Sequence, residues 1–139
     1  MGTHKCESLD VLVMQVVFRA RSLFRLQQYS DALVAFSHAM ALTETTDEDV
    51  DLEYLEMHGS MVHNIASCYH HLGALDVAQM YYEAAKADFR KALTTGSKAN
   101  SRRLTFVNER LQDLNQCRMP VTGTYCDSRG TSPCSACQP

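Results

Sequence analysis

Apolar residues recur at intervals of three and four along the first 119 residues, a spacing typical of amphipathic helices. Val11, Met14, Val17 and Phe18 begin this pattern. All three prolines lie at position 120 or later, so no residue before Pro120 obliges a helix to break. The pattern therefore predicts an all-α fold.

Capping residues and turns divide this region into five predicted helices. Ser30 and Asp31 can cap the second helix, residues 45–47 can cap the third, and Gly73 fits the C-terminal cap of the third. Residues 94–97 separate the fourth helix from the fifth. We expect helices over about 8–26, 30–42, 47–72, 75–93 and 98–117.

An internal repeat relates two of these helix pairs at a constant offset of 46 residues. Small residues match small residues, and large apolar residues match large ones, across both helices of each pair. The matched pairs are Ala20 with Ala66, Leu23 with Tyr69, Leu26 with Leu72, Tyr29 with Leu75, Ala32 with Ala78, Phe36 with Tyr82, and Ala39 with Ala85. Small residues at fixed places allow close helix packing, so the repeat predicts two similar antiparallel hairpins.

This pattern resembles the tetratricopeptide repeat (TPR) family, and its strongest instance is the segment 64–73 followed by Ala78, Tyr82 and Ala85. The resemblance implies antiparallel hairpins stacked as a short superhelix with a C-terminal capping helix. The chain would then consist of a helical domain over 1–118 and a flexible tail over 119–139. The domain would contain repeats at about 13–46 and 59–92, an acidic insertion at about 43–58 and a capping helix at about 97–117. The chain lacks the family's tryptophan and repeat-ending proline. An unrelated antiparallel bundle is the alternative.

Charge is unevenly distributed, although the formal net charge is only −3. Residues 26–85 contain ten acidic residues and no Lys or Arg, whereas residues 86–118 contain eight basic residues and three acidic ones. A nucleic-acid partner requires a dominant basic face, so we expect none. The basic segment could bind a smaller anion such as a carboxylate-bearing peptide. The alternative is that these charges only form a solvated helix face.

The TPR resemblance implies that a partner peptide binds in a concave groove lined by the first, third and fifth helices. Residues there that avoid the packed positions are the candidate peptide-binding residues: Arg21, Arg25, His63, Asn64, Ser67, His71, Lys98 and Arg102.

A second resemblance, to the TPR region of large immunophilins and related co-chaperones, rests on the residues 63–69 and 98–103. It implies a clamp for an acidic C-terminus formed by Asn64, Lys98 and Arg102. Two cations one helical turn apart can hold an anion while an amide donates a directed hydrogen bond. Val17 and Arg21 stand where the family offers Lys and Asn, and no second helix completes the third repeat. In the alternative interpretation, Lys98 and Arg102 are solvent-facing charges of the capping helix, and Asn64 forms a local hydrogen bond on its helix face.

The cysteines and histidines offer weaker metal-binding patterns. A zinc ion bound by Cys117, Cys126, Cys134 and Cys137 has only one Cys-x-x-Cys pair, so a reduced tail is the simpler interpretation. Cys68 is expected to pack as a small hydrophobe. His63 and His70 share a helix face, but no carboxylate or cysteine joins them at ligand spacing.

No phosphate loop, nucleophile elbow or metalloprotease motif occurs, so we expect neither an enzyme nor a bound cofactor. The N-terminus has no secretory pattern and no apolar run is long enough to span a bilayer, so we expect a cytoplasmic protein without a membrane partner. The sequence predicts a protein–protein interaction adaptor, with a chaperone C-terminal peptide as one candidate ligand. The alternative is a scaffold subunit of a cytoskeletal or ciliary assembly.

Overall fold

The structure, a computed structural model, describes residues 3–43, 51–94 and 98–116. Within these ranges it contains five helices and no strand, which confirms the predicted all-α fold. In chain order the helices are α1 (Thr3–Arg25), α2 (Tyr29–Leu42), α3 (Leu52–His71), α4 (Leu75–Leu93) and α5 (Lys98–Asn115). None of them is both long and apolar enough to cross a membrane.

Two helix starts differ by five residues from the expected positions, and the expected cap of α2 is absent, because α2 begins at Tyr29 after Gln28 and so contains Ser30 and Asp31. α1 begins at Thr3 rather than near Ser8. α3 begins at Leu52, because the Asp51 side chain accepts a hydrogen bond from the backbone N–H of Tyr54 at 2.8 Å and caps the helix there. The expected cap at 45–47 lies outside the described residues.

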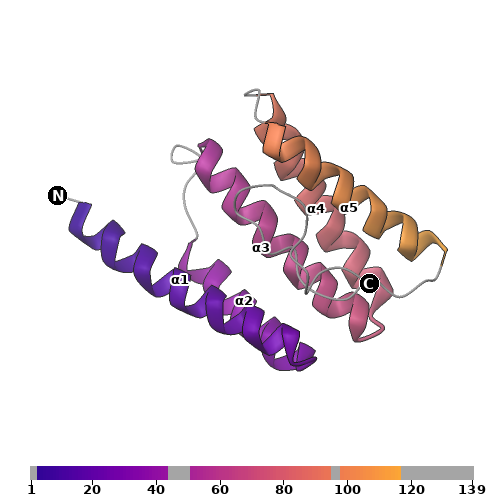
Figure 1. Cartoon of the computed structure of the whole chain (residues 1–139), viewed down its shortest axis with the longest axis horizontal. Coiled ribbons are helices and arrows are strands. Elements are labelled where there is room, and N and C mark those ends of the chain that lie inside the picture. The colour runs from indigo at the N-terminus through magenta and orange to yellow at the C-terminus, as the bar shows by residue number, and fades with distance from the viewer. Residues whose placement is uncertain (1–2, 44–50, 95–97, 117–139) are drawn as a thin grey trace.

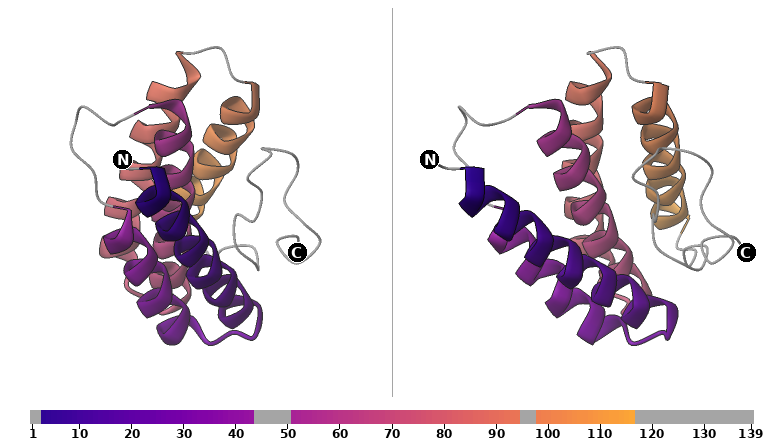
Figure 2. Two further views of the ribbon diagram at one scale, coloured as in Figure 1. Left: turned by 90° about the vertical axis from the view of Figure 1, so that its left-hand side faces the viewer. Right: turned by 60° about the vertical axis from the view of Figure 1, so that its left-hand side comes forward.

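The helices pack mainly against their neighbours in sequence, so the chain builds a stack of hairpins (Figure 1). α1 and α2 form the first antiparallel hairpin, and α3 and α4 form the second. α3 packs on α2, and α5 packs on α4 at the opposite side of the stack. Two further views show the same order, with α5 as a single helix beyond the second hairpin (Figure 2).

The burial pattern repeats at the same 46-residue offset as the sequence. All six alanines of the aligned pairs are fully buried, and so are Phe36 and Tyr82. Burying one such aromatic ring stabilises a fold by about 1.5–3 kcal/mol. Exposure repeats as well, because Val34 on α2 and Met80 on α4 are 69% and 70% exposed. The two hairpins are therefore copies of one packing arrangement.

The turn that ends α1 is a Schellman motif. Gln27 has a φ of 62°, and its N–H donates to the carbonyl of Phe24 at 2.9 Å. The next N–H, that of Gln28, donates to the carbonyl of Leu23 at 2.9 Å. These two bonds satisfy carbonyl groups that the helix end leaves without partners.

The turn that ends α3 has the same hydrogen bonds 46 residues later. Gly73 has a φ of 85°, and its N–H donates to the carbonyl of His70 at 3.1 Å. The N–H of Ala74 donates to the carbonyl of Tyr69 at 2.9 Å. The predicted C-terminal cap at Gly73 is confirmed. Glycine adopts positive φ without steric cost, whereas Gln27 holds the same conformation with a side chain.

Another glycine permits the close approach of α3 to α4. A Cβ atom at Gly59 would lie 2.8 Å from Cε1 of Phe89, which is below ordinary contact distance. Phe89 is itself fully buried. Position 59 therefore accepts only glycine unless the ring moves.

Exchanging the residues of the two turns is expected to change stability in opposite directions. Gln27→Gly should raise the free energy of unfolding by about 0.5–1 kcal/mol, because it removes the left-handed strain. Gly73→Gln should lower it by about 1 kcal/mol, and since a Cβ at this position meets no atom within 4 Å, the cost is conformational. Urea denaturation measures both, and equal stability of the variants would contradict the assignment.

Candidate functional site

The eight candidate peptide-binding residues lie on α1, α3 and α5 but differ in exposure. Arg25, Lys98 and Arg102 are exposed, and Arg21 and His71 are half-buried. The remaining three, His63, Asn64 and Ser67, are buried at 0%, 3% and 2% exposure. The cations thus reach the surface, while the neutral polar groups of α3 lie inside the stack.

Ser67 belongs to a buried group of polar residues around the Tyr82 hydroxyl. That hydroxyl lies 3.2 Å from the Ser67 Oγ and 3.2 Å from Nδ1 of His70. All three residues are buried. Burial raises the pKa of the Tyr82 phenol well above its ordinary value, so the hydroxyl stays protonated. These contacts join α3 to α4.

His63 lies between α4 and α5 without exposure to solvent. Its ring meets that of Tyr82 edge-on, with centroids 5.3 Å apart, and stacks on Phe106 of α5 at 5.1 Å. The Arg110 guanidinium lies 5.1 Å from the centre of the same Phe106 ring. Burial, with a further contribution from Arg110, lowers the pKa of His63 to about 3. His63 is therefore neutral at neutral pH.

His71 joins the end of α3 to the first hairpin. It stacks on Tyr29, with centroids 4.2 Å apart and planes inclined by 6°, and meets Phe24 edge-on at 5.3 Å. Burial lowers the pKa of His71 to about 4, and the charges of His70 and Arg110 contribute further. His71 is thus a packing residue between the hairpins in this structure.

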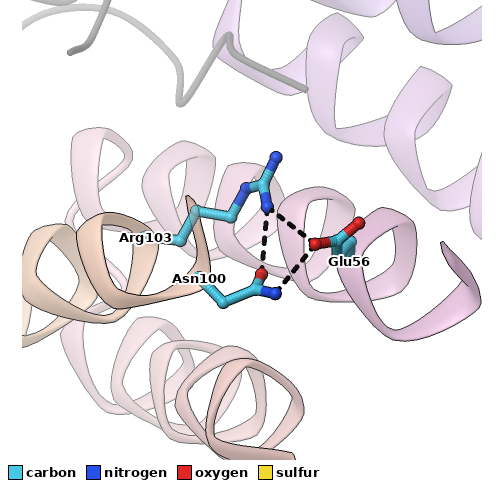
Figure 3. A network of polar contacts seen from close by, with 3 residues as sticks. All are labelled: Glu56, Asn100 and Arg103. Carbon is cyan, nitrogen blue, oxygen red and sulfur yellow. Dashed lines mark hydrogen bonds and ion pairs between the residues drawn. The ribbon is translucent and has the colours of Figure 1, made fainter. Parts of the chain in front are cut away.

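A buried polar network attaches α5 to α3 (Figure 3). Nη1 of Arg103 donates to Oε2 of Glu56 at 3.2 Å and to Oδ1 of Asn100 at 2.9 Å. Nδ2 of Asn100 donates to the same Glu56 oxygen at 2.8 Å. Asn100 and Arg103 are almost fully buried, at 0% and 1% exposure. A buried charge of this kind requires a partner, and Glu56 supplies it.

Sequence reasoning did not identify this network, although Asn100 and Arg103 stand three residues apart in line with apolar Val107. The adjacent residues Arg102 and Arg103 lie in different environments, because Arg102 is exposed and Arg103 is buried. Lys98 and Arg102 remain together as two exposed cations one helical turn apart, which is the spacing expected of an anion clamp.

No group of three or more His, Cys, Asp or Glu residues that could hold a metal occurs in 11–43, 51–94 or 98–116. The four candidate zinc ligands, Cys117, Cys126, Cys134 and Cys137, lie outside the described residues. Cys68 is fully buried, and burial raises the pKa of its thiol to about 12, as expected of a packed cysteine.

Comparison with known protein families, with characterised proteins and with solved structures finds no match. The site is therefore interpreted from the residues of this chain alone.

Lowering the pH from 7 to 5 is expected to reduce the free energy of unfolding by about 1–2 kcal/mol through His63, with a further, smaller loss through half-buried His71. In the unfolded chain His63 takes up a proton near its ordinary pKa of 6.5, whereas folding holds that pKa near 3. The stabilisation is complete above pH 6.5 and is lost progressively as the pH falls towards 3.

Urea denaturation at several pH values measures this loss. His63→Leu should remove most of the pH dependence and leave the smaller contribution of His71, while the same change at exposed His38 should leave it intact. An unchanged slope in His63→Leu would contradict the assignment.

Glu56→Ala is expected to lower the free energy of unfolding by about 2 kcal/mol, because it leaves Arg103 buried without its carboxylate. Adding Arg103→Met to Glu56→Ala should recover part of the loss. The control is Glu53→Ala, an exposed glutamate on the same helix, which should change stability by less than about 0.5 kcal/mol. Equal losses from the two alanine variants would show that the network contributes nothing.

Proposed function

We propose that this chain is a protein–protein interaction adaptor of the tetratricopeptide type, which binds a segment of a partner protein. The observation that carries the proposal is the repeated hairpin, since sequence, burial and turn geometry all recur at the offset of 46 residues. Stacked helical repeats commonly serve as extended surfaces for binding other proteins. The exposed residues of α1 and α5 are available for such contact, whereas Glu53 is the only fully exposed residue of α3.

The ligand class follows from the exposed cations. Lys98 and Arg102 stand one turn apart on α5, and both are exposed. Such an arrangement suits an acidic peptide with a free carboxylate, because charge-assisted hydrogen bonds to a carboxylate are about twice as strong as neutral ones. Asn64 is buried, at 3% exposure, so we leave it out of the proposed carboxylate contact. We assign the carboxylate contact to Lys98 and Arg102.

Fluorescence anisotropy with a labelled peptide ending in acidic residues tests this proposal. The free carboxylate form should bind about tenfold more tightly than the amidated form, and Lys98→Ala and Arg102→Ala should each weaken binding by about tenfold. Arg90→Ala and Lys91→Ala are the matched controls, because both are exposed cations at the end of α4. Equal binding of the two peptide forms, or equal loss in all four variants, would overturn the clamp.

A scaffold role is the second candidate function. The observation that favours it is the large exposed apolar side chains of α1, which an isolated peptide-binding module does not require.

A further inference from the structure

The helix α5 has a polar outer face and a buried face that carries two arginines. Every exposed residue of the helix is polar: Lys98, Ser101, Arg102, Thr105, Asn108, Glu109, Gln112 and Asn115. On the buried face, Arg103 and Arg110 are 1% and 6% exposed, and their spacing of seven residues places them on the same side of the helix. Two buried cations in equivalent places can be compared directly.

Arg103 has a carboxylate partner on α3, whereas Arg110 has none there. Glu56 precedes Arg103 by 47 positions and accepts a hydrogen bond from its guanidinium (Figure 3). The residue that precedes Arg110 by the same number of positions is His63. The His63 ring stacks on Phe106, whose centre lies 5.1 Å from the Arg110 guanidinium. The place that a carboxylate takes opposite Arg103 is therefore filled, opposite Arg110, by an uncharged ring.

The carboxylate of Asp113, on α5 itself, only partly compensates Arg110. Its Oδ2 lies 3.2 Å from Nε of Arg110 and forms an ion pair with it. Even so, Nε and Nη1 of Arg110 are both buried, and neither donates a hydrogen bond to any atom in 11–43, 51–94 or 98–116. Buried charged donors without an acceptor lower the stability of a fold, so they are rarely retained without a function. The unused donors of Arg110 indicate a binding group for an anion.

We propose that Arg110 binds an acidic side chain of the same peptide whose terminal carboxylate contacts Lys98 and Arg102, an inference that rests on the proposed function. A planar carboxylate matches the guanidinium fork, which is why arginine is the usual residue for this recognition. The carboxylate of the peptide replaces that of Asp113, whose side chain retains 12% exposure and can turn towards solvent.

The spacing along α5 sets the position of the acidic residue in the peptide. Arg110 follows Arg102 by eight residues, which is about 12 Å along the helix axis. An extended peptide covers that distance in about four residues. We therefore expect Asp or Glu about four positions before the C-terminal residue of the ligand.

Peptides that differ only at this position test the assignment by fluorescence anisotropy. A peptide with Glu there and a free C-terminus should bind about tenfold more tightly than the same peptide with Gln. Arg110→Met should abolish this preference but keep the preference for a free over an amidated C-terminus, because Lys98 and Arg102 are unchanged. Arg90→Met, which removes an exposed cation of α4, is the control and should keep both preferences.

Two outcomes of this comparison would overturn the assignment. One is a Glu preference that survives Arg110→Met. The other is the lack of any Glu preference when the residue is moved in turn to each of the six positions before the C-terminal residue. Circular dichroism establishes that each variant remains helical.

Asp113→Asn provides a readout that a merely structural role of Arg110 would not produce. This change removes the carboxylate that competes for Arg110, so the peptide with Glu should bind several-fold more tightly, whereas the peptide with Gln should bind as before. Equal or weaker binding of the Glu peptide would contradict the competition and with it the assignment.

Failure of this inference can be told apart from failure of the proposed function. The side-chain Nε–H signal of Arg110 in NMR spectra, identified by its absence in Arg110→Lys, reports on this site without a contact at Lys98 and Arg102. An amidated peptide with Glu should shift the signal, and its Gln counterpart should not. A shift without any preference for a free C-terminus would support the Arg110 site and overturn the clamp. The reverse result would overturn the Arg110 site alone.

Discussion

Close contact between helices at alanine positions is the constraint on which the rest of this structure depends. Each hairpin buries three alanines completely, together with one aromatic ring, which is Phe36 in the first hairpin and Tyr82 in the second. A larger side chain at any of these alanines would separate the helices and uncover the ring. The close contact of α3 with α4, and with it the polar group around Tyr82, depends on that spacing.

Much of the fold could be predicted because hairpin packing is encoded locally. Helical spacing, small residues at matched positions and Gly73 at a helix end each have a physical meaning within a few residues. The start of α3 was placed too early, because several acidic and hydroxyl residues before Leu52 can all cap a helix and only the folded backbone selects Asp51. The positive φ of Gln27 could not be predicted from the sequence either, since glutamine has no preference for that conformation.

The candidate site was less predictable, because exposure on a helix depends on which neighbour covers each face. Arg102 and Arg103 are adjacent in sequence, yet the second is buried against Glu56, 47 positions earlier in the chain. His63 was assigned to a binding face, but its ring packs between α4 and α5. Polar residues therefore help to attach α5, which the helical pattern does not indicate. Contacts between residues so far apart in the sequence produce no periodic pattern from which they could be predicted.

The polar outer face of α5 has a consequence for polymerisation. Repeat stacks whose two ends complement each other can add units end to end and grow into fibres. Here the ends are chemically unlike, because α5 exposes charged and amide groups while α1 exposes the apolar side chains of Val11, Met14 and Phe18. The polar α5 surface is not complementary to these apolar side chains, so we expect little tendency towards head-to-tail growth. We therefore expect concentrated solutions of the chain to contain no filaments built by end-to-end stacking of the described helices.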